Sequence, residues 1–140
     1  HRAADAHRLL NDTLALKRSP VGAAKASDAA SRCAAADRVI DVQIGRLLAY
    51  RVATLQDTGK VPNYEASVSK LYGSELVQRV ARFAVSYLGM SGQLLPGSAH
   101  ALAGGRLTNA YMTSVSATIA GGTSEVQRGI IAGRGLGMPR

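Results

Sequence analysis

The residues best suited to chemistry lie near the carboxyl terminus, in the stretch GGTSEVQR from Gly121 to Arg128. The two glycines can adopt positive φ, which ends one helix and lets the backbone approach another body closely. Ser124 and Gln127 follow at capping-box spacing for a new helix. The free N–H groups of such a helix start can bind an anionic group. A tight turn between two helices explains the same residues without a ligand, so both interpretations stay open here.

Arg18, in the segment RSPVG, is the second candidate. A guanidinium is permanently charged and can bind two phosphate oxygens at once, which suits a phosphate partner. Pro20 restricts the residue before it and predicts the end of a helix near Arg18. A cation at a helix C-terminus also has a purely structural role, because it interacts favourably with the helix dipole.

The histidines and the single cysteine form no metal-ligand pattern. His1, His7 and His100 show no ligand spacing with acidic residues or with Cys33, so no metal site is predicted. Cys33 cannot form an internal disulfide, and its Ala-rich surroundings predict a small buried side chain in a reducing compartment. The sequence GLG at 135–137 follows a predicted helix rather than a strand, which excludes a dinucleotide fingerprint.

Composition and charge narrow the class of protein. The 140 residues are 46% hydrophobic and only 4% aromatic, without Trp, which favours closely packed helices over a β-sandwich. The net charge of +8 attracts anions such as nucleic acid, anionic lipid or nucleotide phosphates. The basic residues are scattered, as on solvated helix faces, although a basic helical module that binds nucleic acid is an alternative. The absence of a long apolar run predicts a cytoplasmic protein without a membrane span.

Apolar residues at three-to-four spacing predict the helices that must position these candidates. No segment alternates with period two, so the expected fold is all-α, a single domain over residues 1–140 with four main helices and a short C-terminal helix. The start without Met, already in helical register, suggests a piece of a longer polypeptide. The predicted helices cover residues 3–17, 28–56, 63 or 64 to 88, 106–119 and 124–133. The apolar stripe of the second helix consists of Val39, Ile40, Ile44, Leu47, Leu48, Val52 and Leu55.

Three separated segments carry a resemblance to a known family. TIAGGTSEVQRGIIAGRGLGMPR, from Thr118 to Arg140, resembles the C-terminal signature of the acyl-CoA dehydrogenases. The segment from Tyr50 to Gly89 is similar to that family's long helical pair, and RSPVG resembles its R-x-x-F-G motif. The resemblance covers essentially the whole chain. It implies the C-terminal helical bundle of an FAD-dependent oxidoreductase that removes hydrogens from Cα and Cβ of an acyl-CoA thioester, in fatty acid metabolism.

The resemblance also implies roles for individual residues. Arg18 matches the arginine that reaches the FAD pyrophosphate, typically of a neighbouring subunit, and Thr123 and Glu125 match positions that contact FAD. Gly89 matches the first glycine of the family's Q-I-L-G-G, another cofactor-binding position. The implied partners are acyl-CoA, the N-terminal helical and β domains or a companion subunit, and neighbours in a homo- or hetero-tetramer. No nucleic-acid partner is expected, because a basic module would not explain three ordered motifs.

The sequence also departs from the family pattern. Gly121 stands where many members carry the catalytic glutamate, so no catalytic residue is predicted in this chain. Ser86 and Met90 replace a glutamine and a glycine of Q-I-L-G-G, and Val21 replaces the phenylalanine of R-x-x-F-G. One branch of the family carries its base on an earlier helix, which would lie upstream of His1. A base-lacking subunit or assembly domain of the same fold, or a related flavin monooxygenase, is therefore the alternative function.

Overall fold

The computed structural model describes residues 2–139, which form helices joined by turns and contain no strand in that range. The predicted all-α fold is confirmed. The α-helices are α1 (Arg2–Ala15), α2 (Pro20–Ser27), α3 (Ala29–Asp57), α4 (Tyr64–Leu88), α5 (Arg106–Ser114) and α6 (Ser124–Ile130). Shorter helical turns connect or extend them, namely η1 (Leu16–Arg18), η2 (Gly89–Gln93), η3 (Leu102–Gly105), η4 (Val115–Thr118) and the π-helical η5 (Ile131–Gly135).

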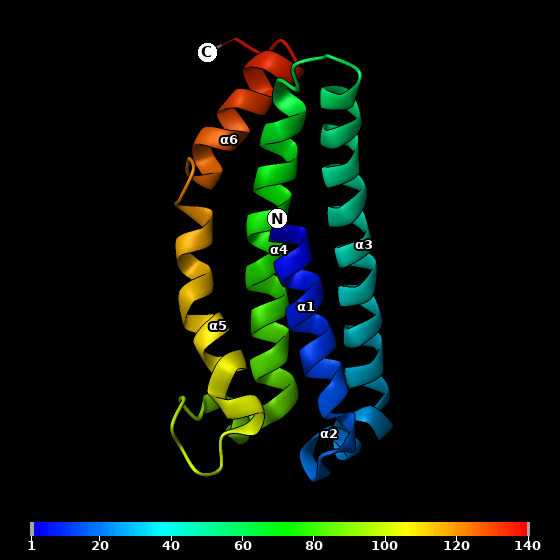
Figure 1. The fold of residues 1–140 in the computed structure, drawn as a ribbon, viewed down its shortest axis with the longest axis vertical. Coiled ribbons are helices and arrows are strands. Elements are labelled where there is room, and N and C mark those ends of the chain that lie inside the picture. Colours follow the sequence, from blue (N-terminus) through cyan, green and yellow to red (C-terminus); the bar gives the residue numbers. More distant parts are fainter. Residues whose placement is uncertain (1, 140) are drawn as a thin grey trace.

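Helix α4 lies in the middle of the bundle (Figure 1). In that view α3 flanks α4 on one side, α5 and α6 flank it on the other, and α1 packs against both α3 and α4. Successive long helices run in alternate directions, so the carboxyl end of α4 lies beside α2, whereas α6 packs against the amino-terminal half of α4. Helix α4 therefore connects the two ends of the molecule.

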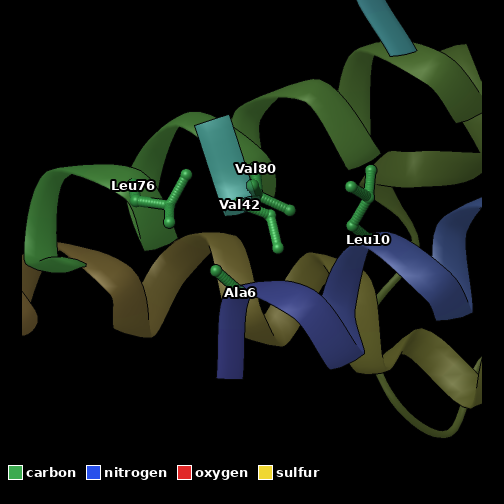
Figure 2. Close-up of a cluster of buried hydrophobic side chains, with 5 residues drawn as sticks. All are labelled: Ala6, Leu10, Val42, Leu76 and Val80. Atoms are coloured by element: carbon green, nitrogen blue, oxygen red, sulfur yellow. The ribbon is translucent and has the colours of Figure 1, made fainter. Parts of the chain in front are cut away.

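The main core lies where α1, α3 and α4 meet. Figure 2 shows its five central side chains, from Ala6 and Leu10 on α1, Val42 on α3, and Leu76 and Val80 on α4. Each is at most 2% exposed. Burying a side chain such as leucine or valine contributes about 1.5–3 kcal/mol, so these few contacts hold the three helices together.

The contact face of α3 differs from the predicted one. Val42 and Gly45 are buried, and a Cβ on Gly45 would lie only 2.8 Å from Cδ2 of Leu76, so a glycine is needed for the close approach of α3 and α4. The stripe predicted to face the core is wrong in its first half, because Ile40 and Leu47 are 58% and 66% exposed. Val39 and Ile44 are exposed too, while Leu48, Val52 and Leu55 are half-buried.

Two further expectations are corrected near the amino-terminal end of α3. The segment after Arg18 forms the helix α2, because Pro20 occupies a first helical position, where a missing N–H costs nothing. The N–H of Ala23 donates to the carbonyl of Ser19 at 2.8 Å, which begins this helix. Cys33, expected to be buried, is exposed on α3, because α3 turns its small alanine-rich face outward at this point.

Candidate functional site

The turn between η4 and α6 is built on two glycines. Gly121 and Gly122 have φ values of +73° and +94°, which residues with side chains rarely adopt. A Cβ on Gly122 would lie 2.6 Å from Nε2 of Gln127, so position 122 has little room for a side chain. The prediction that the glycine pair ends the preceding helix is confirmed. We call residues 119–123 the α5–α6 turn.

The cap of α6 is made by a different residue from the one predicted. Thr123 is the N-cap, and its Oγ1 accepts a hydrogen bond from the N–H of Val126 at 3.3 Å. The predicted capping box of Ser124 and Gln127 is therefore wrong by one position. Nε2 of Gln127 donates instead to the carbonyl of Gly121, at 3.1 Å. The hydroxyl of Thr123 therefore has a structural role as the N-cap of α6.

Two side chains of α4 hold the α5–α6 turn and α6. The ammonium of Lys70 donates to the carbonyl of Gly122, and the guanidinium of Arg128 lies 2.6 Å from the carboxylate of Glu75. Burial lowers the pKa of Lys70, and the nearby charge of Arg2 lowers it further. Sequence reasoning did not find Lys70, because nothing in the pattern of residues 64–88 shows which loop a lysine there reaches.

Glu125 lies in the first turn of α6, next to the Thr123 cap. Hydrogen bonds from its own backbone N–H and from the Thr123 hydroxyl, together with the charge of Arg128, lower the pKa of Glu125. Its side chain is 81% exposed, so the start of α6 presents an ionised carboxylate to the outside. Gly121 has no side chain, so position 121 offers no acid or base.

The other two predicted residues lie near the opposite end of α4. Arg18 is the last residue of η1 and is exposed, and no hydrogen bond or ion pair within residues 2–139 involves its guanidinium. Gly89 caps the C-terminus of α4 with φ +57° and ψ −132°. A Cβ on Gly89 would meet nothing within 4 Å, so the backbone conformation alone favours glycine there.

A cavity of about 310 Å³ lies between η1, α2, α3 and the end of α4. Three cationic side chains line it, those of Lys17, Lys25 and Arg32, whereas no acidic side chain among the described residues does. The adjacent Asp28 is occupied as the N-cap of α3, where its carboxylate accepts from the N–H of Ser31 at 2.8 Å. We call Arg18 and these three cations the cationic end. Its charge was missed in the sequence, because the residues are scattered and only folding gathers them.

The structure therefore divides the predicted residues into two groups. Thr123 and Glu125 lie at the start of α6, and the adjoining turn bonds to Lys70. Gly89 comes 19 residues after Lys70, which corresponds to about 28 Å along α4 at the rise of an α-helix. Arg18, at the cationic end, lies near the same end of α4, because η1 packs against α2 and α2 packs against α4. A ligand that contacts both groups on one chain would have to span most of the bundle.

The chain folds as an antiparallel all-α bundle with a short, threonine-capped helix near its carboxyl end. The chain belongs to the family described as acyl-CoA dehydrogenase, C-terminal domain, whose model matches residues 2–136. The resemblance that the motifs carry is thereby confirmed. Members of this family use FAD. No helix in the described part of the chain is both long and apolar enough to cross a membrane.

Curated relatives agree with this assignment. The chain is 34% identical over 102 residues to acyl-CoA dehydrogenase FadE26 of Mycobacterium tuberculosis, which covers 70% of this chain and 25% of that protein. It is 32% identical over 123 residues to the mitochondrial short-chain specific acyl-CoA dehydrogenase of Bos taurus, covering 86% of this chain and 27% of the relative. The chain thus spans about a quarter of the length of these relatives.

Solved structures show the same fold. The steroid ACAD Tcur3481-Tcur3483 superposes with a TM-score of 0.91 at 27% identity, over 99% of this chain and 35% of that chain. The ChsE4-ChsE5 complex from Mycobacterium tuberculosis superposes with a TM-score of 0.83 at 25% identity, over 99% of this chain and 36% of that chain.

Proposed function

We propose that this chain is the C-terminal helical domain of an FAD-dependent, acyl-CoA dehydrogenase-like oxidoreductase, in which it contributes FAD contacts and subunit contacts. The observation that carries the proposal is the start of α6, where a threonine cap and an exposed carboxylate, Thr123 and Glu125, follow a glycine turn. Family membership and the names of its relatives support it. The activity would be the α,β-dehydrogenation of acyl-CoA thioesters.

The residues present fit a flavin dinucleotide in chemical terms. A diphosphate needs permanent cations, and Arg18 offers a guanidinium that no other described residue engages. Lys17, Lys25 and Arg32 add positive charge without a lining acid. FAD, when bound, supplies the acceptor for the hydride that leaves Cβ of the substrate. Because the two groups of residues lie far apart, Arg18 serves the FAD of a neighbouring subunit in this proposal.

The start of α6 has a different task. The hydroxyl oxygen of Thr123 and the ionised carboxylate of Glu125 can each accept a hydrogen bond from a polar group of FAD. No residue at position 121 can take the α-proton, so in this proposal the base comes from a part of the polypeptide outside residues 1–140, or from a companion subunit.

A second candidate function is a base-lacking subunit of the same fold. Three observations favour it: Gly121 at the usual base position, and Ser86 and Met90 in place of the cofactor-contacting glutamine and glycine. Two similar solved structures are themselves complexes, the ChsE4-ChsE5 complex and Tcur3481-Tcur3483. In that role the chain would serve assembly and complete the FAD site of its companion through Arg18.

The test uses the polypeptide that contains this chain, purified with any companion subunit encoded beside it. A yellow protein that bleaches when acyl-CoA is added supports the dehydrogenase. A colourless protein that still oligomerises supports the base-lacking subunit, and a colourless monomer contradicts both.

Arg18→Ala tests the cofactor contact directly. Loss of a hydrogen bond to a charged partner weakens binding by about 1.5–3 kcal/mol, so FAD affinity should fall roughly tenfold to a hundredfold. Lys60→Ala is the matched control, because it removes one exposed positive charge from the turn after α3, at the other end of the bundle. Equal FAD affinity in Arg18→Ala and the parent protein would refute this assignment.

A further inference from the structure

Both carbonyls of the glycine pair accept hydrogen bonds from side chains of other segments. The carbonyl of Gly121 accepts from Gln127 of α6, and the carbonyl of Gly122 accepts from the ammonium of Lys70. The second contact joins residues 52 positions apart in the chain. Within residues 2–139 no other side chain of α4 donates to this pair of carbonyls, so Lys70 is the direct link between the core helix and the glycine turn.

The stem of Lys70 also passes beside position 121. A Cβ on Gly121 would lie 4.0 Å from Cε of Lys70 and would meet nothing closer. A side chain at position 121 would therefore extend next to the terminal carbons and ammonium of Lys70. Arg2, on α1, places a second positive charge near this ammonium. Lys70 therefore places a positive charge beside position 121, where many relatives carry a carboxylate.

We propose that Lys70 is a positioning residue that fixes the α5–α6 turn on α4 and places a cation beside position 121. By fixing the Gly122 carbonyl, Lys70 orients the adjacent Thr123 cap and so the start of α6. The meaning of this cation for acyl-CoA chemistry rests on the proposed function. A carboxylate added at position 121 would pair with the ammonium of Lys70, which stabilises its ionised form and weakens it as a base. Restoring a base at this position therefore requires two changes, at 121 and at 70.

The first test measures amide hydrogen exchange in the complete protein, with its companion if it has one. Lys70→Met keeps an unbranched side chain without the charge. Exchange in residues 119–127 of this variant should become about tenfold faster, because local opening of the turn no longer has to break the Lys70 hydrogen bond and therefore costs less free energy. Residues 38–50 of α3 should exchange as before. Lys70→Arg should restore slow exchange. Unchanged exchange in residues 119–127, or equal acceleration in both segments together with failure of Lys70→Arg to restore it, would overturn the proposal.

The second test is a double-mutant cycle on the charge beside position 121. Gly121→Glu and Gly121→Gln carry the same backbone cost at φ +73°, so that cost cancels between them. With Lys70 present, the Glu variant should have an unfolding equilibrium constant about fivefold smaller than the Gln variant, at the upper end of what solvent-exposed ion pairs contribute. In the Lys70→Met background the two should agree within about twofold. If the Glu and Gln variants have equal unfolding equilibrium constants in both backgrounds, the proposal that Lys70 places a cation beside position 121 is refuted.

Neither readout uses flavin or acyl-CoA, so the outcome is separate from that of the proposed function. A colourless protein that passes both tests refutes the dehydrogenase but keeps Lys70 as the positioning residue. A yellow, active protein that fails both tests supports the dehydrogenase and refutes Lys70 as the positioning residue.

Discussion

The start of α6 and the cationic end differ in how completely their polar groups are satisfied, because at the cationic end only Arg32, among its four cations, donates a side-chain hydrogen bond within residues 2–139, to the carbonyl of Ser27. At the start of α6 the carbonyls of the turn and the Thr123 hydroxyl are bonded within the chain, to Lys70, Gln127 and Val126. At the cationic end, Arg18 has no such partner within residues 2–139, and the cavity beside it holds lysines without an acid. One region is pre-organised by its own contacts, whereas the other gathers charge that an anionic ligand would neutralise.

This difference predicts opposite responses to mutation. Changes at the start of α6 should lower the free energy of unfolding, because they break contacts that already exist. Changes at the cationic end should leave stability almost unaffected and alter anion binding, because like charges held together contribute little to folding.

Gly122→Ala should destabilise the fold by about 2 kcal/mol. The left-handed backbone at φ +94° costs a side-chained residue roughly 1 kcal/mol, and displacing Gln127 from its bond to the Gly121 carbonyl costs about 1 kcal/mol more. Urea denaturation measures the change. Gly129→Ala on α6 is the control, because its Cβ meets nothing within 4 Å and alanine should stabilise the helix by about 0.5–1 kcal/mol. Similar losses in both variants would show that the turn is not specially constrained.

Thr123→Ala should cost about 1 kcal/mol of stability, the usual value for removing an N-cap hydroxyl. Thr123→Ser keeps the oxygen that accepts from Val126 and should lie close to the parent protein. Thermal unfolding of the three proteins makes the comparison. If serine is as damaging as alanine, the methyl group and not the cap holds the start of α6.

The double variant Lys17→Gln, Lys25→Gln should change the free energy of unfolding by no more than about 0.5 kcal/mol, as for surface residues without specific partners. The same variant should weaken binding of inorganic pyrophosphate, and this weakening should shrink as salt is added, because exposed charges are screened. A large loss of stability would mean that these lysines belong to the folded core, and the contrast between the two regions would disappear.

The smallest effect concerns Glu125 and pH. Its pKa is lowered in the folded protein by its own backbone N–H and the Thr123 hydroxyl. A lowered pKa stabilises the fold above the unfolded-state pKa, and this contribution disappears as the pH falls through the folded-state pKa. Glu125→Gln should therefore flatten the acid part of the stability profile slightly. An unchanged profile would show that the exposed carboxylate contributes nothing to the cap.

Much of the helical architecture was predictable, because local signals mark the helix ends. The helix predicted to start at residue 63 or 64 and to end at 88 matches α4, and that over 28–56 differs from α3 by one residue at each end. The side chain of Asp28 caps the start of α3 as an N-cap residue should, and Gly59, with φ +73°, follows its end. These boundaries depend on neighbours in sequence, so a sequence pattern can find them.

What each helix faces was less predictable. The stripe of α3 had the right period, but Val42 and Gly45 meet the core while Ile40 faces outward. Periodicity reports that an apolar face exists and not what covers it. The link from Lys70 to Gly122 spans 52 residues, and such a contact depends on how α4 and α5 pack. The roles carried over to Arg18 and Glu125 depend on a ligand and on further polypeptide, so they remain predictions.

Helix α4 runs without a break from Tyr64 to Leu88. Its first half contacts α6, and its carboxyl end lies beside the cationic end. Inserting one residue after Glu75 would rotate everything beyond it by about 100° and advance it by about 1.5 Å. The α6 side would keep its place, while the Gly89 end would swing to another side of the bundle axis. Evolution can therefore lengthen or shorten the loops at either end freely, but the residue count within α4 is constrained, because it keeps the two regions in phase.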